Sequence, residues 1–139
     1  MERKIILASH GRFASGINSS LQLICGENSQ IVTLDCYLSE EFDLAAAVKE
    51  IIEENAGFEL VVITDLFGGS VNNEFLKYIQ NANYYLVAGL NLPFLVEFVT
   101  QYFTADSTAE LINRTLMSSK EMIKFCNEAI EQAPEEEEF

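Results

Sequence analysis

The chain has 139 residues, 49% of them hydrophobic and 22% charged, which is the usual balance of one soluble globular domain. Its 8 basic and 22 acidic residues give a net charge of −14, which argues against nucleic acid and anionic membrane surfaces as partners, because both are bound mainly through lysine and arginine. Cys25, Cys36 and Cys126 are odd in number and lack CxxC spacing, so we expect reduced thiols and neither a metal site nor a cofactor.

Strand and helix signals alternate from the start of the chain. Residues 4–8 form a continuous apolar run, which predicts a strand covered on both faces. Apolar residues at helical spacing then predict a helix over 13–24. A second apolar run predicts a strand over 30–37, and the next helix begins at a cap that is either Ser39 or Asp43.

The same alternation continues through the second half. A third buried strand is predicted over 59–64, followed by a helix that has Ser70 at its N-cap and runs through Ile79. A fourth strand is predicted over 84–88. Pro93, after the next turn, suits the first turn of a further helix.

The C-terminal part is predicted to be a last helix over 107–131, which completes a single domain spanning residues 1–131. Residues 132–139 contain a run of glutamates and are predicted to form an acidic, disordered tail. The apolar residues that follow Lys4 are too few for a secretory signal, and no run approaches the ~20 apolar residues of a membrane helix. We therefore expect a cytoplasmic protein.

This order of elements predicts an α/β fold, an open doubly wound parallel sheet with helices on both faces. Right-handed crossovers favour the strand order 2-1-3-4, in which the first and third strands are neighbours. Ligands of such sheets collect at the carboxyl ends of the strands, where the winding direction reverses. The loop with His10 and the loop with Asp65 meet at that point.

His10 is the only histidine of the chain, and a neutral imidazole can act as a nucleophile that carries a covalent group. Asp65 is the candidate partner that fixes the ring tautomer and supports positive charge on the ring, as the aspartate of a hydrolase triad does. Together they predict a catalytic pair for phosphoryl transfer. The alternative is structural: the histidine only packs, and Asp65 only caps its own turn.

Gly68, Gly69 and Ser70 lead into a helix, where backbone N–H groups and the helix dipole favour a phosphate. The hydroxyls of Ser70 and Ser9 add candidate phosphate contacts. Again there is a structural alternative, in which the two glycines only form a tight turn and Ser70 only caps the helix. The convergence of these residues on the crevice of His10 favours a phosphate site.

Three motifs resemble those of one family: Ile5–Gly16 (IILASHGRFASG), Thr64–Ser70 (TDLFGGS) and Gly89–Glu97 (GLNLPFLVE). In order and spacing they are similar to the IIA component of mannose-family sugar phosphotransferase systems, and the resemblance extends to about residue 130. It implies that His10 accepts a phosphoryl group from the phosphocarrier HPr and passes it to the IIB component. IIB then phosphorylates sugar that enters through the membrane components IIC and IID.

The resemblance also implies that Asp65 is the partner of the histidine and that the turn from Gly68 to Ser70 contacts the phosphate. Two features depart from the family pattern. Val71 replaces the proline that usually follows Gly-Gly-Ser, although Asn73 keeps the asparagine. Some members also dimerise through a short C-terminal strand, whereas residues 107–131 are predicted to be helical. A homodimer is therefore expected through other surfaces.

Transfer between two histidines requires an exposed ring, so we expect HPr and IIB to compete for one apolar docking face around His10. Loops held by the rigid sheet are suited to form such a face. Its candidate residues are Phe13, Phe67, Leu92 and Phe94. For Phe67, packing in the core is the alternative role.

Three other functions remain as alternatives. A receiver-like domain would be phosphorylated on Asp65, but the first predicted strand ends in Ser9 and His10 and supplies no acidic pair to hold Mg²⁺. A flavodoxin-like binding module would do no covalent chemistry, and its flavin would absorb light in the purified protein. A phosphocarrier domain of a dihydroxyacetone kinase is related to the family above.

Overall fold

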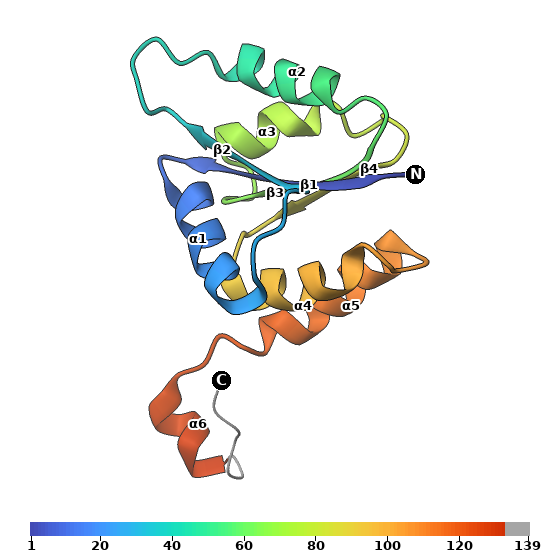
Figure 1. Cartoon of the computed structure of the whole chain (residues 1–139). Coiled ribbons are helices and arrows are strands. Elements are labelled where there is room, and N and C mark those ends of the chain that lie inside the picture. Colours follow the sequence, from blue (N-terminus) through green and yellow to red (C-terminus); the bar gives the residue numbers. More distant parts are fainter. Residues whose placement is uncertain (133–139) are drawn as a thin grey trace.

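A parallel sheet of four strands, in the order β2-β1-β3-β4, forms the centre of the computed structural model, which describes residues 1–132 (Figure 1). The predicted α/β class and strand order are confirmed. β1 pairs in parallel with both β2 and β3, and β4 pairs with β3. The strands are β1 (Arg3–His10), β2 (Ile31–Cys36), β3 (Glu59–Thr64) and β4 (Tyr84–Ala88).

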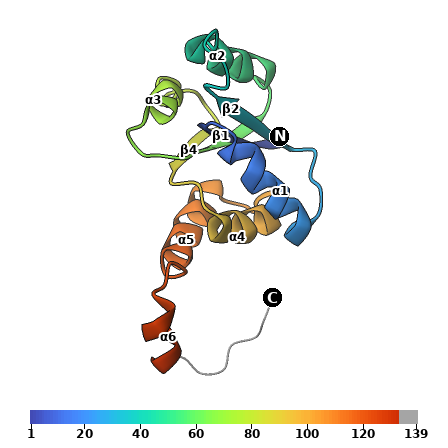
Figure 2. The same cartoon turned by 90° about the vertical axis from the view of Figure 1, so that its left-hand side faces the viewer.

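Helices cover both faces of this sheet. Those described are α1 (Phe13–Cys25), α2 (Leu44–Glu54), α3 (Ser70–Leu76), α4 (Leu92–Tyr102), α5 (Thr108–Lys120) and α6 (Cys126–Gln132). α2 and α3 lie on one face, and α1, α4 and α5 lie on the other (Figure 1). α6 projects away from these layers (Figure 2).

The sheet divides the core into two apolar clusters. Ile5 and Leu7 of β1 pack with α1 and α4, whereas Ile6 and Ala8 pack with α2 and α3. All four residues are fully buried, because successive side chains of a strand point to opposite faces that are both covered. Burial on both faces explains why continuous apolar runs predicted the strands.

Side-chain caps fix where three of the described helices begin, and Ser107 is the cap of α5. Asp43 is the correct one of the two predicted caps of α2, and its Oδ1 accepts a hydrogen bond from the Ala46 amide at 3.1 Å. Asn91 caps α4 in the same way, accepting from the Phe94 amide at 2.8 Å. Pro93 lies in the first turn of α4, as predicted.

α3 differs from its prediction at both ends. Its N-cap is Gly69 and its first helical residue is Ser70, so the predicted N-cap role of Ser70 is wrong. The Ser70 hydroxyl forms a hydrogen bond with the ring of His10 instead of with its own backbone. The helix ends at Leu76 and not at Ile79, because the following residues form tighter turns with i to i+3 hydrogen bonds.

The prediction of one helix over 107–131 is wrong, because α5 ends at Lys120 and α6 begins only at Cys126. α5 packs on α4 and buries Leu111, but after Ser119 the chain leaves the core. The side chains that continue the apolar pattern are exposed there: Met122, Ile123, Phe125 and Ile130.

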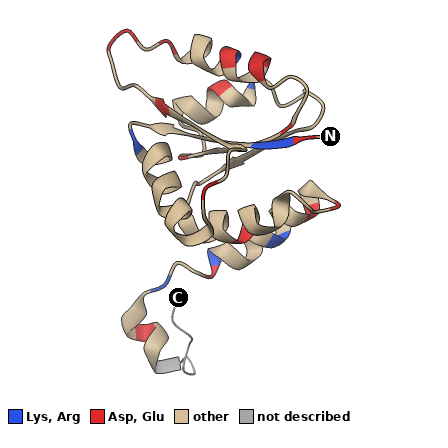
Figure 3. Cartoon of the chain, viewed as in Figure 1, with Lys and Arg blue, Asp and Glu red and all other residues tan. Residues whose placement is uncertain are grey.

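Acidic side chains are spread over helices and loops, with several on α2 (Figure 3). Within residues 1–132, no helix combines the length and the apolar character that crossing a bilayer requires. The predicted tail, 132–139, lies outside the described residues, apart from Gln132 at the end of α6.

Candidate functional site

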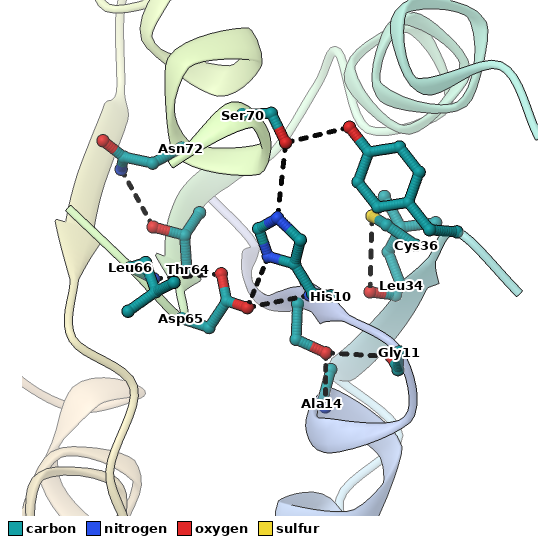
Figure 4. Close-up of polar contacts among 12 residues, drawn as sticks. His10, Gly11, Ala14, Leu34, Cys36, Thr64, Asp65, Leu66, Ser70 and Asn72 are labelled. Carbon is teal, nitrogen blue, oxygen red and sulfur yellow. Dashed lines mark hydrogen bonds and ion pairs between the residues drawn. The ribbon is translucent and has the colours of Figure 1, made fainter. Parts of the chain in front are cut away.

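The carboxyl ends of β1 and β3 lie side by side and carry His10 and Asp65. The register pairs Ala8 with Thr64, so His10 and Asp65 both follow at the same end of the sheet. His10 Nδ1 lies 2.8 Å from Asp65 Oδ2, and the backbone amide of His10 donates to the same oxygen, also at 2.8 Å (Figure 4). The structure thus brings together the two residues of the predicted catalytic pair.

Asp65 is held as a carboxylate by the groups around it. Partial burial acts to raise its pKa, but hydrogen bonds from the amide and ring of His10 and from the Leu66 amide outweigh burial and lower the pKa. The Leu66 amide donates to Asp65 Oδ1 at 2.9 Å. Both carboxylate oxygens therefore have partners, and the side chain is only 11% exposed.

The carboxylate determines which nitrogen of His10 is free. An ionised carboxylate can only accept, so in the neutral ring of His10 the proton is on Nδ1 and a lone pair is on Nε2. Nε2 faces the Ser70 hydroxyl at 3.3 Å. The His10 side chain is 43% exposed, which leaves this nitrogen within reach of a reactant.

Tyr37 also contacts the site, and the sequence reasoning missed it. Its hydroxyl lies 2.9 Å from Ser70 Oγ, and its ring centroid lies 5.5 Å from that of His10. Tyr37 directly follows β2, the strand beside β1, so its place at the carboxyl end of a neighbouring strand was a signal that could have been used.

Two glycines shape the turn before α3 for different reasons. Gly68 has a φ of +78°, a left-handed conformation that strains other residues. At Gly69 the requirement is space, because a Cβ would lie only 3.2 Å from Leu66 Cβ and 3.3 Å from Leu66 O, and it would also touch His10 Cε1 at 3.6 Å. The Gly69 amide donates to Leu66 O at 3.1 Å and the Gly68 amide to Asn72 Oδ1 at 3.4 Å, so both amides have partners within the turn.

Two asparagines hold this turn, and only one of them stood out in the sequence. The buried Asn72, which was missed, donates from Nδ2 to Thr64 Oγ1 at 2.8 Å and so ties α3 to the end of β3. Asn73 donates to Gly68 O at 3.1 Å. Val71, at the position where proline was expected from the resemblance, is fully buried in the core beside α2.

Ser9 lies away from the exposed side of His10. Its hydroxyl accepts a hydrogen bond from the Ala14 amide at 2.7 Å and donates to Gly11 O at 3.1 Å. The residue is fully buried. In this arrangement its hydroxyl serves the start of α1 and offers no free group to a phosphate.

The four predicted docking residues have different environments. Phe67 is 90% exposed and Phe13 is 47% exposed, and Leu66 beside them adds further apolar surface. Leu92 is partly buried. Phe94 is 1% exposed, because α4 turns it into the core, where it stacks on Phe98; its predicted docking role is therefore wrong.

The thiols do not add a reactive group to the site. Cys36 is buried at the end of β2, and burial, reinforced by Asp65 and Asp35, raises its pKa to about 11. Cys25 and Cys126 are free and exposed. Across residues 1–132, no cluster of three or more His, Cys, Asp or Glu side chains is arranged to hold a metal ion.

The chain matches a family model and several solved structures. The family model for the PTS system fructose IIA component, EIIA-man, matches residues 4–116. The chain is similar to a protein of Klebsiella pneumoniae subsp. pneumoniae assigned as a permease of a phosphoenolpyruvate-dependent sugar phosphotransferase system (PTS), with 42% identity over 94% of this chain and 95% of that chain and a TM-score of 0.90.

Two streptococcal structures are more distant. Component EIIA of the phosphotransferase system of Streptococcus agalactiae is 28% identical over 90% of this chain and 98% of that chain, with a TM-score of 0.79. The PTS IIA protein associated with the fucose utilization operon of Streptococcus pneumoniae is 26% identical over 94% of this chain and 97% of that chain, with a TM-score of 0.77.

Proposed function

The chain belongs to the EIIA-man family of phosphotransferase system IIA components, and on this premise we propose that it is a histidine phosphocarrier for sugar uptake. In this role His10 receives a phosphoryl group from HPr and passes it to the IIB component, which phosphorylates sugar entering through IIC and IID. The carrier acts in the cytoplasm, where it reaches the transporter at the inner face of the membrane.

The observation that carries the proposal is the accessible His10 beside Asp65. Because Asp65 Oδ2 holds the Nδ1 side at 2.8 Å, the Nε2 lone pair is available to attack phosphorus in line. The bond between phosphorus and the donor nitrogen breaks, and its electron pair returns to the donor. The Asp65 carboxylate balances the positive charge that builds on the His10 ring.

Ser70 and the glycine turn form the proposed phosphate site, in which Ser70 supplies the contact and the glycines supply the space. The Ser70 hydroxyl already lies 3.3 Å from Nε2, the atom that would bond to phosphorus. Gly69 leaves room beside the His10 ring that a larger residue would fill, and Gly68 supports the turn. Ser9 is not kept as a phosphate contact, because its hydroxyl is engaged at the start of α1.

Labelling tests the proposal. Incubation with phosphoenolpyruvate, enzyme I and HPr is expected to add one phosphate that is stable in alkali and lost in acid, as a phosphohistidine is. His10→Ala is expected to remain folded and to take no label. A label that alkali also removes would point to an acyl phosphate on Asp65, the receiver-like alternative, and would contradict the proposal.

The acceptor separates the sugar carrier from the related dihydroxyacetone kinase carrier. The phosphorylated protein is expected to transfer its label to a IIB component and not to a dihydroxyacetone kinase. The observed match to a family model of a PTS IIA component supports the first acceptor. Transfer to the kinase alone would overturn the assignment to sugar uptake.

We further propose that HPr and IIB dock on one apolar rim, formed by Phe13, Leu66 and Phe67, because both must reach the same phosphorus. These three side chains are exposed beside the site. Phe67→Ala is expected to weaken binding of both partners, measured by NMR titration, while Leu23→Ala, an equally exposed change on α1, has no effect. Simultaneous binding of HPr and IIB would contradict a shared rim.

A homodimer is also part of the proposal. A groove of about 490 Å³ lies beside the start of the projecting segment 121–132 and has a mainly apolar lining that includes Ile24, Leu92 and Met122. The segment itself exposes Ile123 and Phe125. Reciprocal insertion of this segment into the groove of a second copy would bury both apolar surfaces with twofold symmetry.

A further inference from the structure

Tyr37 is held over the His10 ring by an unusual backbone conformation. Its φ is +64°, in the left-handed region that bulky residues rarely adopt. Phe42 packs against the Tyr37 ring in an edge-to-face arrangement, with centroids 5.4 Å apart. Strain of this kind persists only where the surrounding structure imposes it, and it is concentrated at functional sites.

The hydrogen bonds of the site fix the direction in which each hydroxyl donates. His10 uses its Nδ1 proton toward Asp65, so Nε2 accepts and the Ser70 hydroxyl donates to it. Ser70 has a single hydroxyl proton. The Tyr37 hydroxyl therefore donates to Ser70 Oγ, at 2.9 Å. The hydroxyls of Tyr37 and Ser70 thus form a hydrogen-bond chain that ends at the lone pair of His10 Nε2.

We propose that Tyr37 is a second hydroxyl, beside Ser70, that binds the phosphoryl group on His10; this role rests on the proposed function. Once Nε2 bonds to phosphorus, its lone pair is used and the Ser70 hydroxyl loses its acceptor. Both hydroxyls then donate to phosphoryl oxygens. Hydrogen bonds to charged acceptors are stronger than those between neutral groups, so this change favours the phosphorylated state.

No proton is transferred by Tyr37 in this step. The Nε2–P bond forms as the bond between phosphorus and the donor histidine breaks, and that electron pair returns to the donor nitrogen. The protons of Ser70 and Tyr37 stay on their own oxygens and change only their acceptor. Tyr37 therefore stabilises the phosphohistidine and does not serve as an acid or base.

Tyr37→Phe tests this role, because it removes the hydroxyl and keeps the ring beside His10 and Phe42. Potassium phosphoramidate phosphorylates histidine without a partner protein, so each variant can be examined by ³¹P NMR. We expect the ³¹P resonance of Tyr37→Phe to differ from that of the wild type. The equilibrium of exchange with phospho-HPr is expected to move about tenfold toward HPr, the effect of losing one hydrogen bond to a charged group.

Two further variants serve as controls. Tyr85→Phe deletes the same kind of hydroxyl from β4, near the opposite edge of the sheet, and is expected to match the wild type in both measurements. Tyr37→Gly suits the left-handed backbone and is expected to fold, yet to show the same loss as Tyr37→Phe. Equal losses in the two variants would show that the missing hydroxyl, and not a changed loop conformation, causes the loss.

The outcomes distinguish this inference from the proposed function. An unchanged ³¹P resonance and exchange equilibrium in Tyr37→Phe would overturn the role of Tyr37. If HPr fails to phosphorylate the wild type, while phosphoramidate still gives the altered resonance in Tyr37→Phe, the sugar-uptake proposal fails and the role of Tyr37 stands. If neither donor labels His10, both are wrong.

Discussion

One carboxylate oxygen, Asp65 Oδ2, accepts from both the backbone and the ring of His10. The sequence could predict this pair, because the carboxyl ends of neighbouring parallel strands meet at one edge. Its place after the second strand could have marked Tyr37, but the contact of its ring with His10 depends on a φ of +64°, which tertiary contacts impose and residue type does not predict. The buried side-chain hydrogen bond of Asn72 likewise depends on how α3 packs on β3 and has no signal in the sequence.

The lowered pKa of Asp65 predicts a pH dependence of stability. A carboxyl group with a lower pKa in the folded state than in the unfolded state stabilises the fold above its unfolded pKa, and this stabilisation is lost as pH falls through the folded pKa. Between pH 5 and pH 2, wild-type protein is therefore expected to lose more free energy of unfolding than Asp65→Asn. Urea unfolding at each pH measures the difference. Parallel stability curves of Asp65→Asn and wild type across the acid range would show that the pKa of Asp65 is not lowered in the folded protein.

The same variant is expected to transfer phosphate slowly at neutral pH, because an amide can hold the ring but cannot balance an imidazolium charge. Unchanged transfer rates would show that the charge of Asp65 has no role in transfer.

Gly69→Ala is predicted to impair transfer and to destabilise the protein only slightly. The new methyl group would lie 3.2 Å from Leu66 Cβ and 3.3 Å from Leu66 O, so the turn must shift by a few tenths of an ångström, and the free energy of unfolding is expected to fall by about 1 kcal/mol. The methyl group would also lie 3.6 Å from His10 Cε1, where it takes space beside the ring that the phosphoryl group needs. Phosphorylation by HPr is expected to slow roughly tenfold or more, since small displacements of reacting groups are costly.

Gly16→Ala is the matched control, because no atom lies within 4 Å of the position that its methyl group would take. Gly16 lies inside α1, so alanine is expected to stabilise the protein by about 0.5–1 kcal/mol and leave phosphorylation unchanged. Equal phosphorylation rates in Gly69→Ala and wild type would show that the space beside His10 has no role.

At the scale of elements, the bounds of a strand or helix were predicted correctly where other parts of the same chain bury it. The strands over 59–64 and 84–88 have the predicted bounds, because each is a short apolar run enclosed by polar or turn residues. The prediction of one helix over 107–131 was wrong, because the apolar spacing continues past Ser119, where the apolar side chains are exposed and do not pack on the core. Apolar spacing indicates that an apolar face exists, and does not indicate whether this chain covers it.

The amino end of β3 is tied to the helical layer by Glu59. Its Oε2 accepts from the Tyr102 hydroxyl at 2.8 Å and from Thr108 Oγ1 at 2.9 Å, and it lies 3.2 Å from Arg3 Nε. Burial, reinforced by Glu59, raises the pKa of the Tyr102 phenol. The phenol therefore remains a neutral donor, and the group joins β1, β3, α4 and α5.

Tyr102→Phe is predicted to destabilise the protein without affecting transfer. It leaves the largely buried Glu59 carboxylate short of one donor, so the free energy of unfolding in urea is expected to fall by about 1–2 kcal/mol. The rate of His10 phosphorylation is expected to stay at the wild-type value, because the two groups lie at opposite ends of the sheet. A rate that falls with stability would show that the ends are coupled.

At the scale of the whole molecule, the projecting segment predicts self-association. Replacing Ile123 and Phe125, which are 82% and 65% exposed, by aspartate is expected to convert the proposed dimer into a monomer, measured by sedimentation equilibrium. Apolar burial holds the proposed interface, and buried carboxylates without partners would oppose it. The monomer is expected to remain folded, because neither side chain packs in the core.

Leu76→Asp is the matched control, since Leu76 is also exposed but belongs to α3 on the other face of the sheet. It is expected to sediment like the wild type. A wild-type protein that is monomeric at all accessible concentrations would contradict insertion of the segment into a second copy.

The two ends of the sheet carry separate tasks. Glu59 pairs with Arg3 at the start of β1, and His10 lies seven residues further on at its end, so at ~3.3 Å per residue the Glu59 group and the His10 site are about 23 Å apart. Effects of substitutions at such distances, without shared partners, add to one another within small errors. Substitutions on the proposed docking rim and substitutions near Glu59 are therefore expected to act independently, the first on partner binding and the second on thermal stability. Selection can then change partner recognition and thermal stability through different sets of residues.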